Sequence, residues 1–320
     1  MKQNKLQTIN VCFASDDGYA EHLLVAIFSL IANLKTDYKA DIYILDGGIS
    51  EKNRNNLKNL ERKFANVQIS FIAMSDEKYD HLPTCFALTK ATYFRLELAN
   101  LLPNIHKMLY LDVDIIVNKD ISELWEIDIG DNALGAITDA AIYYYNKLLH
   151  IPSKYGYFNA GVLLMNFPYF REHTITSKIF DWIDIHNKII ILGDQDALNA
   201  ILRDQRKELP LKYNVLPYIF TRPRNQLFSQ KERKKAKTDP VIIHFAGTKP
   251  WKKYCFHPLR HKYHAYRGMA GVEPITFSKK IDIGLFMRNC ISQICYHLFN
   301  IIPQKWHYAL LYKPKEILGL

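Results

Sequence analysis

Hydrophobic and polar positions along the first part of the chain follow two alternating periods. Apolar residues alternate with others over residues 9–13, as in a β-strand, and then recur at helical spacing over residues 23–34. The change of period repeats up to residue 112, with polar turns between the segments. The pattern predicts strands at 9–13, 41–46, 67–73 and 107–112, and helices at 23–34, 50–64 and 89–100.

The second half is less regular but contains further apolar segments. Strands are predicted at 158–166 and 241–245, and helices at 176–188 and 194–206. Residues 222–237 form a strongly basic, polar segment. This composition fits a solvated loop as well as it fits a loop beside an anionic substrate.

Strands that alternate with helices predict an α/β fold, in which a mostly parallel sheet is flanked by helices on both faces. Ligands of such sheets bind beyond the carboxyl ends of the strands, and Asp16 and Asp112 both lie at predicted strand ends. Neither a Gly-x-Gly-x-x-Gly fingerprint after the first strand nor a P-loop is present, which disfavours a dinucleotide-binding oxidoreductase. Phosphate is therefore expected to be held by a metal and by basic side chains.

The composition is that of a globular protein with one large domain or two smaller ones. The chain has 320 residues, of which 48% are hydrophobic and 23% charged. Its five cysteines are scattered, without the spacing of a zinc site. The N-terminus lacks the apolar core of a signal peptide, and no run of about 18 apolar residues predicts a transmembrane helix. We therefore expect a cytoplasmic protein.

The most informative stretch is residues 110–114, in which a short apolar strand ends in two carboxylates, Asp112 and Asp114. Mg²⁺ and Mn²⁺ prefer oxygen ligands and are usually held by a few carboxylates together with substrate phosphate. The pair therefore fits a divalent cation that also binds a diphosphate. A polar turn after a buried strand is the alternative.

Six spaced segments resemble those of glycosyltransferase family 8, in the family's order, and span roughly residues 8–260. The resemblance is to its bacterial lipopolysaccharide and lipooligosaccharide α-galactosyltransferases and α-glucosyltransferases. It implies a GT-A type nucleotide-sugar-binding fold and a retaining transferase that uses a UDP-sugar and Mn²⁺. The segments are FASDDGYA at 13–20, TYFRLEL at 92–98, LYLDVDIIV at 109–117, YFNAGVLLMN at 157–166, GDQDALN at 193–199 and HFAGTKPW at 244–251.

The resemblance implies that Asp112, Asp114 and His244 are the metal ligands. An imidazole ligand is compatible with Mn²⁺ and favours it over Mg²⁺, which is the alternative. A lone histidine after a strand is usually structural, and the setting in HFAGTKPW is what indicates ligation. Gly247 would let the backbone approach the diphosphate, and Lys249 would place a positive charge on it.

The resemblance also implies a uridine pocket, in which a carboxylate accepts the uracil N–H and an aromatic ring stacks on the base. For Tyr19 the alternative is packing at the start of a helix. Arg95 lies among apolar residues and needs an anionic partner. The resemblance places it beside the donor sugar and the Asp-x-Asp segment. The alternative is an internal salt bridge with Glu97 or Asp114, and both can hold. The donor-binding residues implied are Ala14, Ser15, Asp16, Tyr19, Arg95, Asp112, Val113, Asp114, Gly247 and Lys249.

Four short polar residues, Asp139, Asn159, Asp194 and Gln195, resemble the family's sugar-facing and catalytic set. For Asp194 the alternative is capping of the helix that follows. Gln195 is the candidate nucleophile on the β-face of the sugar, but an amide is a poor nucleophile. We therefore favour attack from the same face as the departing UDP, with a UDP oxygen as the base for the acceptor hydroxyl.

The net charge of +10 is concentrated near the C-terminus, where residues 251–320 contain eleven Lys or Arg and three Asp or Glu. Apolar residues recur at helical spacing over 283–298, and basic and aromatic residues follow. We expect a GT-A catalytic domain at 1–270 and a basic amphipathic tail at 271–320 that associates with an anionic membrane. A helix packed on the catalytic domain and a dimer contact are the alternatives.

The implied function is transfer of a hexose, galactose rather than glucose, from a UDP-sugar to a hydroxyl of a lipopolysaccharide or lipooligosaccharide sugar. The implied partners are the UDP-hexose, a lipid-linked oligosaccharide acceptor and the inner face of the inner membrane. One alternative is a glycogenin-like transferase that acts on protein or glucan. Another is a catalytically silent nucleotide-sugar-binding protein. Nucleic-acid binding is disfavoured, because the aromatic residues of the tail lie in an apolar context.

Overall fold

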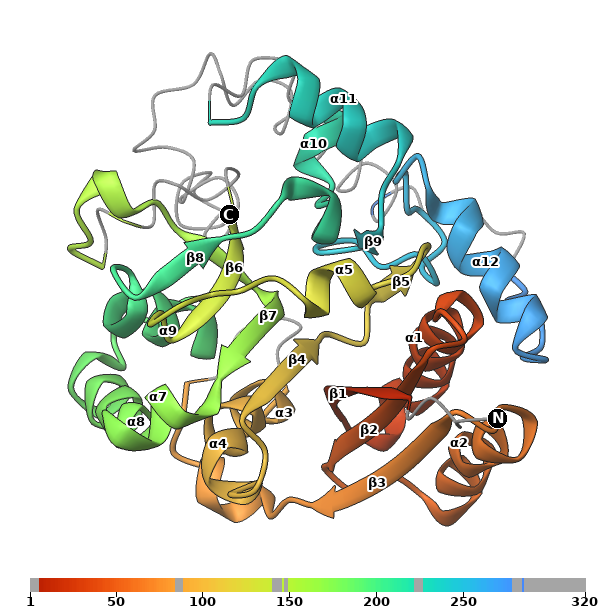
Figure 1. Ribbon diagram of the computed structural model, residues 1–320, viewed down its shortest axis with the longest axis horizontal. Helices are drawn as coiled ribbons and strands as arrows, with labels where there is room; N and C mark the ends of the chain where they lie inside the picture. Colours follow the sequence, from red (N-terminus) through yellow and green to blue (C-terminus); the bar gives the residue numbers. More distant parts are fainter. Residues whose placement is uncertain are drawn as a thin grey trace.

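The structure of the chain is a computed structural model, which describes residues 6–83, 89–139, 149–221 and 227–277 together with Asn146 and Gly284. Most of its strands belong to one central sheet (Figure 1). The strands are β1 (Gln7–Ser15), β2 (Tyr38–Asp46), β3 (Val67–Ala73), β4 (Lys107–Leu111), β5 (Ile115–Val117), β6 (Leu134–Thr138), β7 (Phe158–Asn166), β8 (Arg206–Glu208) and β9 (Ile242–His244).

Helices fill the connections between these strands. The α-helices are α1 (Ala20–Asn33), α2 (Glu51–Lys63), α3 (Ala91–Phe94), α4 (Leu98–Leu101), α5 (Ser122–Trp125), α7 (Phe167–Glu172), α8 (Ile175–His186), α9 (Asp194–Leu202), α10 (Tyr218–Thr221), α11 (Gln230–Thr238) and α12 (Arg260–Met269). The short 3₁₀ helices that matter for the site are η1 (Asp17–Tyr19), η3 (Arg95–Glu97) and η5 (Leu211–Tyr213).

The large sheet has the strand order β3-β2-β1-β4-β7-β6-β8. The pairs β1–β2, β2–β3, β1–β4 and β6–β8 are parallel, whereas β7 runs antiparallel to both β4 and β6. The predicted α/β fold with a mostly parallel sheet is therefore confirmed. The carboxyl ends of β1, β4 and β6 meet the start of β7 at one edge, which is where a parallel sheet binds ligands.

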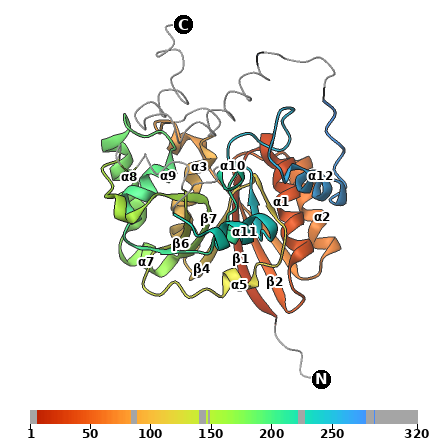
Figure 2. The same ribbon diagram turned by 90° about the horizontal axis from the view of Figure 1, so that it is seen from above.

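Helices cover both faces of the large sheet, with α1 and α2 on one side and α8 and α9 on the other (Figure 2). Side chains of β1 alternate between these faces. Val11 and Phe13 pack against α1 and α2, whereas Cys12 and Ala14 belong to the core cluster formed with α3, α4 and α7–α9. A strand buried on both faces reads as a nearly continuous apolar run, which explains the sequence of β1.

A second, two-stranded sheet pairs β5 with β9 in antiparallel orientation. The sequence predicted β9 but not β5, because three apolar residues are too few to define a period. Both strands are buried throughout. They pack beside α1 and α12, and Figure 1 shows these two helices side by side.

The helix predicted at 89–100 is interrupted. It consists of α3, the 3₁₀ turn η3 and α4, which follow one another directly. At the turn, Arg95 Nε donates to the backbone oxygen of Thr92 at 3.0 Å. The buried guanidinium is fixed by contacts from distant parts of the chain, and helical periodicity cannot report such contacts.

Two expectations for the second half are wrong in part. The helix predicted at 194–206 ends at Leu202, because residues 206–208 form β8 and pair with β6. The segment 222–237 is not a loop throughout, since residues 230–238 form α11. A capping box between Ser229 and Glu232 starts this helix, and its Ser-x-x-Glu spacing is visible in the sequence.

The predicted tail at 271–320 lies almost entirely outside the described residues, which end at residue 277 except for Gly284. Residues 272–277 follow α12, and Val272 and Ile275 pack against a small core cluster that includes Trp251 and Tyr263. In the parts of the chain that the structure describes, every helix is too short or too polar to span a bilayer.

Candidate active site

Two carboxylates and one imidazole converge where the large sheet meets the small one. Asp112 follows β4, Asp114 precedes β5, and His244 is the last residue of β9. One potential ligand atom from each residue lies within 4.8 Å of the others. His244 Nε2 is 3.3 Å from Asp114 Oδ1 and 3.8 Å from Asp112 Oδ2. The structure thus brings together the three residues predicted to bind a metal.

Backbone pairing explains this convergence. The amide of Asp112 donates to the backbone oxygen of Gly161 at 2.9 Å, which continues the β4–β7 ladder by one residue. The chain then enters β5, where Ile115 pairs with His244. Asp114, one residue earlier, is therefore held beside the imidazole. The large sheet fixes one carboxylate, and the small sheet fixes the other carboxylate and the histidine.

The ligand atoms of these three residues fit a divalent cation. Nδ1 of His244 lies 2.9 Å from Oδ1 of Asn214, and Nε2 on the other side of the ring faces the two carboxylates. An unprotonated Nε2 directed at two carboxylate oxygens is electrostatically unfavourable unless a cation lies between them. Carboxylate oxygens together with an imidazole nitrogen are suitable ligands for Mn²⁺.

Gly161 provides the space between these ligands. A Cβ atom at this position would lie 2.6 Å from Asp112 Oδ2 and closer still to the ring of His244. Real side chains do not tolerate such distances, and both neighbours are held in place by the sheets. A glycine within a strand can mark a close approach of this kind.

Arg95 is buried beside the carboxylates. Its Nη2 atom is 3.0 Å from Asp112 Oδ1, and its Nε atom is 3.0 Å from Asp194 Oδ2. Burial favours the neutral form of Arg95, but the charges of Asp112 and Asp194 outweigh this effect and raise its pKa above the usual value. Arg95 therefore does form an internal salt bridge, as the alternative stated. The suggested partners Glu97 and Asp114 are wrong, because Arg95 pairs with Asp112 and Asp194.

Lys249 pairs with Asp114 on the other side of the metal ligands. Burial would raise the pKa of Asp114, but the charge of Lys249 outweighs this effect and holds that pKa well below its usual range. The same ion pair raises the pKa of Lys249 against the opposing effect of burial. Both groups are therefore charged at neutral pH.

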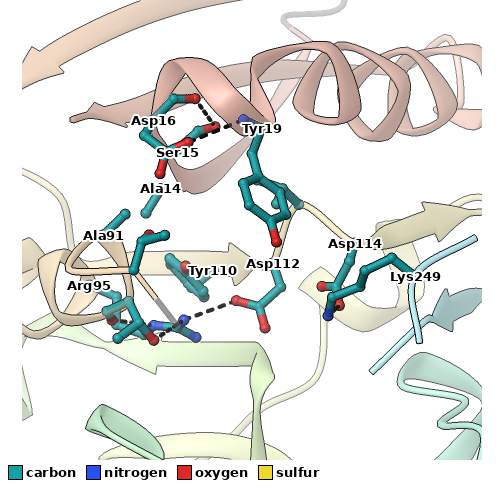
Figure 3. Close-up of a pocket in the computed structure, with 13 residues that line it drawn as sticks. Ala14, Ser15, Asp16, Tyr19, Ala91, Arg95, Tyr110, Asp112, Asp114 and Lys249 are labelled. Carbon is teal, nitrogen blue, oxygen red and sulfur yellow. Dashed lines mark hydrogen bonds and ion pairs between the residues drawn. The ribbon is translucent and has the colours of Figure 1, made fainter. Parts of the chain in front are cut away.

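A cavity lies beyond the carboxyl ends of β1 and β4 (Figure 3). Figure 3 shows Tyr19, Asp112, Asp114 and Lys249 around one side of it and Arg95 with Tyr110 around another. The predicted donor-binding residues that line the cavity are Ala14, Ser15, Asp16, Tyr19, Arg95, Asp112, Val113, Asp114 and Lys249. Gly247 is not among the lining residues. It is exposed and has a positive φ of 93°, which few residues other than glycine adopt.

The residues predicted to form a uridine pocket lie at and just after the end of β1. Asp16 caps η1, because its Oδ1 atom accepts a hydrogen bond from the amide of Tyr19 at 3.1 Å. The Tyr19 ring packs edge-on against Trp251, with ring centroids 5.9 Å apart, and against His22 at 6.0 Å. Tyr19 thus packs at a helix start and lines the cavity at the same time.

Gln195 and Asn159 form one hydrogen-bonded group. Oε1 of Gln195 accepts from Asn159 Nδ2 at 3.1 Å and from the amide of Ala160 at 2.8 Å. Nε2 of Gln195 donates to the hydroxyl of Tyr157 at 3.3 Å. These contacts fix the orientation of the Gln195 amide.

Asp194 and Asp139, the other two residues of this set, are both buried. The N-cap of α9 is Gly193, and the Asp194 side chain binds Arg95 and Thr92, so the capping alternative for Asp194 is wrong. Burial raises the pKa of Asp194 to about 6, although Arg95 opposes this shift. Asp139 is buried at the end of β6, and its amide donates to the backbone oxygen of Tyr157 at 2.7 Å. The sugar-facing roles of Asp194 and Asp139 stay predictions.

Several residues of the site were not predicted. Gly161 could have been found, since it interrupts an apolar strand, and Tyr110 stands next to a predicted strand end. Asn214 gave no sequence signal, because a single asparagine is common in loops. The unpredicted residues that line the cavity are Thr89, Ala91, Thr92 and Tyr110.

Residues 10–255 match the family model described as glycosyl transferase family 8. General stress protein A of Bacillus subtilis (strain 168) is 34% identical over 273 residues, which cover 83% of this chain and 94% of that protein. The lipopolysaccharide 1,2-glucosyltransferase of Escherichia coli (strain K12) is 25% identical over 260 residues, which cover 80% of this chain and 76% of that protein.

Among solved structures, the galactosyltransferase LgtC in complex with donor and acceptor sugar analogues superimposes with a TM-score of 0.75. The two chains are 29% identical, and the match covers 83% of this chain and 98% of LgtC. The predicted GT-A type fold is confirmed by this match.

Proposed function

Because the chain belongs to glycosyl transferase family 8, we propose that it transfers a hexose with retention from a UDP-sugar to a hydroxyl of a lipopolysaccharide or lipooligosaccharide sugar. Galactose is the hexose we favour, with glucose as the alternative. The observation behind the proposal is the convergence of Asp112, Asp114 and His244 beside a cavity at the carboxyl edge of the sheet. Relatives named galactosyltransferase and lipopolysaccharide glucosyltransferase support the substrate class.

The proposed cofactor is Mn²⁺, held by Asp112, Asp114 and His244. When bound, it would act as a Lewis acid that offsets the charge developing on the departing UDP. Mg²⁺ is the alternative cofactor. The imidazole in the donor set favours Mn²⁺, because Mg²⁺ usually takes oxygen ligands only.

Basic side chains would stabilise the leaving group from two sides. Lys249 lies at the cavity and can exchange its contact with Asp114 for one with the diphosphate. Arg95 holds Asp112 in place while it lines the cavity itself. A fixed positive charge at developing negative charge lowers the barrier without reorganisation.

The contacts of Gln195 support attack from the same face as the departing UDP. A covalent route would need a free nucleophile on the opposite face of the sugar. Oε1 of Gln195 already accepts two hydrogen bonds, from Asn159 and from Ala160, which lower its nucleophilicity further. We therefore give Gln195 a positioning and electrostatic role. The acceptor hydroxyl would lose its proton to an oxygen of UDP.

The proposed location is the cytoplasmic face of the inner membrane, where the basic tail would hold the enzyme near a lipid-linked acceptor. A glycogenin-like enzyme would instead modify a protein or glucan. The two can be separated by mass spectrometry of the chain after incubation with UDP-glucose. An added mass of one or more hexoses would favour the glycogenin-like alternative.

A panel of UDP-sugars tests the proposal. With Mn²⁺ present, UDP release should be fastest from UDP-galactose and should stop in excess chelator. Asp112→Asn should keep the circular dichroism spectrum and lose most metal-dependent UDP release. If UDP were released from every UDP-sugar no faster than in buffer without the protein, the chain would be a catalytically silent binding protein. Full activity of Asp112→Asn in chelator would contradict the metal assignment.

A further inference from the structure

Asn214 is a fully buried amide that links the two halves of the site. Its Oδ1 atom lies 2.9 Å from Nδ1 of His244, within hydrogen-bonding distance. Its Nδ2 atom donates to Oδ1 of Asn159 at 2.9 Å. His244 belongs to the metal ligands, and Asn159 contacts Gln195 at 3.1 Å. One side chain therefore bridges the metal ligands and the sugar-facing residues.

A backbone amide fixes the orientation of this chain of hydrogen bonds. The N–H of Gly161 donates to Oδ1 of Asn159 at 3.0 Å, so the Asn159 atom at that position must be an oxygen. The Asn214 atom that faces this oxygen must then be the Nδ2 donor. Oδ1 of Asn214 is left to face the ring of His244, and the ring must donate from Nδ1.

The backbone around Asn214 keeps it opposite His244. Val215 forms a parallel bridge to Ile243, and its backbone oxygen accepts from the amide of His244 at 3.2 Å. Asn214 ends the short 3₁₀ helix η5 just before this bridge. These backbone contacts hold the main chain at Asn214 beside β9.

We propose that Asn214 is a positioning residue that holds His244 in the Nδ1-protonated tautomer, with Nε2 free to bind a divalent cation. This inference rests on the metal site of the proposed function. In the other tautomer, Nε2–H would donate to Asp114 and could not act as a ligand. Hydrogen-bonding partners of metal-bound histidines orient the ring in this way, and their loss typically lowers metal affinity 10- to 100-fold.

The chemistry of the amide explains why asparagine stands at this position. An asparagine offers one acceptor and one donor on the same short side chain. Aspartate would still accept from His244 but could not donate to Asn159, and leucine of similar size could do neither. A comparison of the two variants therefore separates the metal-facing contact from the contact with Asn159.

The test compares wild type, Asn214→Asp, Asn214→Leu and the control Asn33→Leu. Asn33 is another partly buried amide, which donates to Val117 O and Tyr266 Oη away from the cavity. Mn²⁺ binding is measured by the loss of the free-ion electron paramagnetic resonance signal, without any sugar nucleotide. Asn214→Leu should bind Mn²⁺ 10- to 100-fold more weakly, whereas Asn214→Asp and Asn33→Leu should stay within about threefold of wild type.

A second readout needs no metal. In protein labelled with ¹⁵N-histidine, the resonance of His244, assigned through its loss in His244→Gln, should report a proton on Nδ1 in wild type and in Asn214→Asp. In Asn214→Leu it should move toward the other tautomer. An unchanged tautomer and Mn²⁺ affinity in folded Asn214→Leu would overturn the inference, as would an equal loss of affinity in Asn33→Leu. Absence of Mn²⁺ binding by wild type would instead overturn the proposed function.

Discussion

Charges around the cavity are only partly balanced by the protein itself. Asp112, Asp114 and Asp194 face two cations, Arg95 and Lys249, and a histidine whose Nδ1 proton is already engaged. When Asp194 is ionised, the three carboxylates carry one more charge than the two cations paired with them. A buried net charge is costly unless a counter-ion joins it, so the site favours binding of a cation.

Gly161 offers the sharpest test of the space between the ligands. Gly161→Ala should weaken Mn²⁺ binding more than tenfold, because the new methyl group would lie 2.6 Å from Asp112 Oδ2 unless the ligands move. The overpacking should also lower the free energy of unfolding by about 1–3 kcal/mol. Titration of Mn²⁺ and thermal unfolding measure the two effects.

The matched control is Gly268→Ala in α12, where an added Cβ meets no atom of the described chain within 4 Å. This variant should bind Mn²⁺ like wild type and should be unchanged or more stable by up to about 1 kcal/mol. Equal Mn²⁺ affinity in Gly161→Ala and wild type would show that Gly161 does not keep the ligand space open.

Arg95 provides a second test at the residue scale. Arg95→Met keeps much of the buried volume but leaves Asp112 and Asp194 without their cation. Removal of one partner from a buried ion pair costs about 3–5 kcal/mol, which urea unfolding would measure. Adding Asp194→Asn should recover part of this loss, because one unpaired charge disappears. If the double variant were no more stable than Arg95→Met, the unpaired charge of Asp194 would not be the cause.

At the scale of elements, periodicity predicted the buried strands and the long helices well. The strands β1, β3, β4 and β7 and the helix α1 each bury a continuous or regular set of apolar side chains, so their sequences indicate their buried surroundings. The short strands β5, β6 and β8 were not predicted. β8 consists of charged residues, and backbone pairing with β6 rather than side-chain burial makes it a strand.

The candidate site could be predicted only as far as residue types allow. Acidic residues at strand ends indicated metal and nucleotide binding, and Asp112 and Asp114 do meet His244. The partners of Arg95 and the bridge through Asn214 depend on which segments the fold brings together. Those segments are far apart in the sequence, and no local pattern of side chains specifies their contacts.

The connection between β9 and α12 contains a histidine that should make stability depend on pH. His257 packs against the rings of Phe220 and Phe245, and burial lowers its pKa from 6.5 to about 4. Its contribution to stability is therefore complete above about pH 6.5 and is lost as the pH falls toward 4. Since one pKa unit corresponds to about 1.4 kcal/mol, this residue alone should reduce the free energy of unfolding by about 2 kcal/mol at pH 5.

The variant His257→Asn checks this origin. An asparagine oxygen can take the place of Nδ1, which accepts from the amide of Leu259 at 3.1 Å, but it does not titrate. Urea unfolding at pH 7 and pH 5 should show a smaller drop in stability for this variant than for wild type. The exposed His261 is the control, and His261→Asn should keep the wild-type drop. An undiminished drop in His257→Asn would assign the acid sensitivity to other groups.

At the scale of the whole molecule, the predicted uridine pocket and α12 are physically connected. His22 Nδ1 lies 2.7 Å from the hydroxyl of Tyr263 in α12, and its ring stacks on Trp251 with centroids 3.6 Å apart. Arg267 of α12 pairs with Glu21 at 2.6 Å. These contacts anchor the segment that leads into the predicted tail beside the helix that begins at Tyr19 (Figure 1).

The predicted tail gives the last test, which separates membrane association from chemistry. Removal of residues 278–320 keeps Val272 and Ile275, which pack against the core cluster of Trp251 and Tyr263, so the remaining chain should fold. The truncated protein should no longer sediment with anionic vesicles but should still release UDP from the donor at the wild-type rate. In the full chain, binding should weaken with salt, since each basic residue near an anionic surface contributes about 1 kcal/mol.

A charge-reversed chain distinguishes electrostatic binding from apolar insertion. With Lys305, Lys313 and Lys315 changed to Glu, the apolar residues of the tail are intact, but its attraction to anionic lipid is lost. This variant should bind anionic vesicles much more weakly than wild type and neutral vesicles equally. Undiminished sedimentation of the truncated protein would place the membrane contact elsewhere on the chain. Loss of UDP release on truncation would instead make the tail part of the donor site.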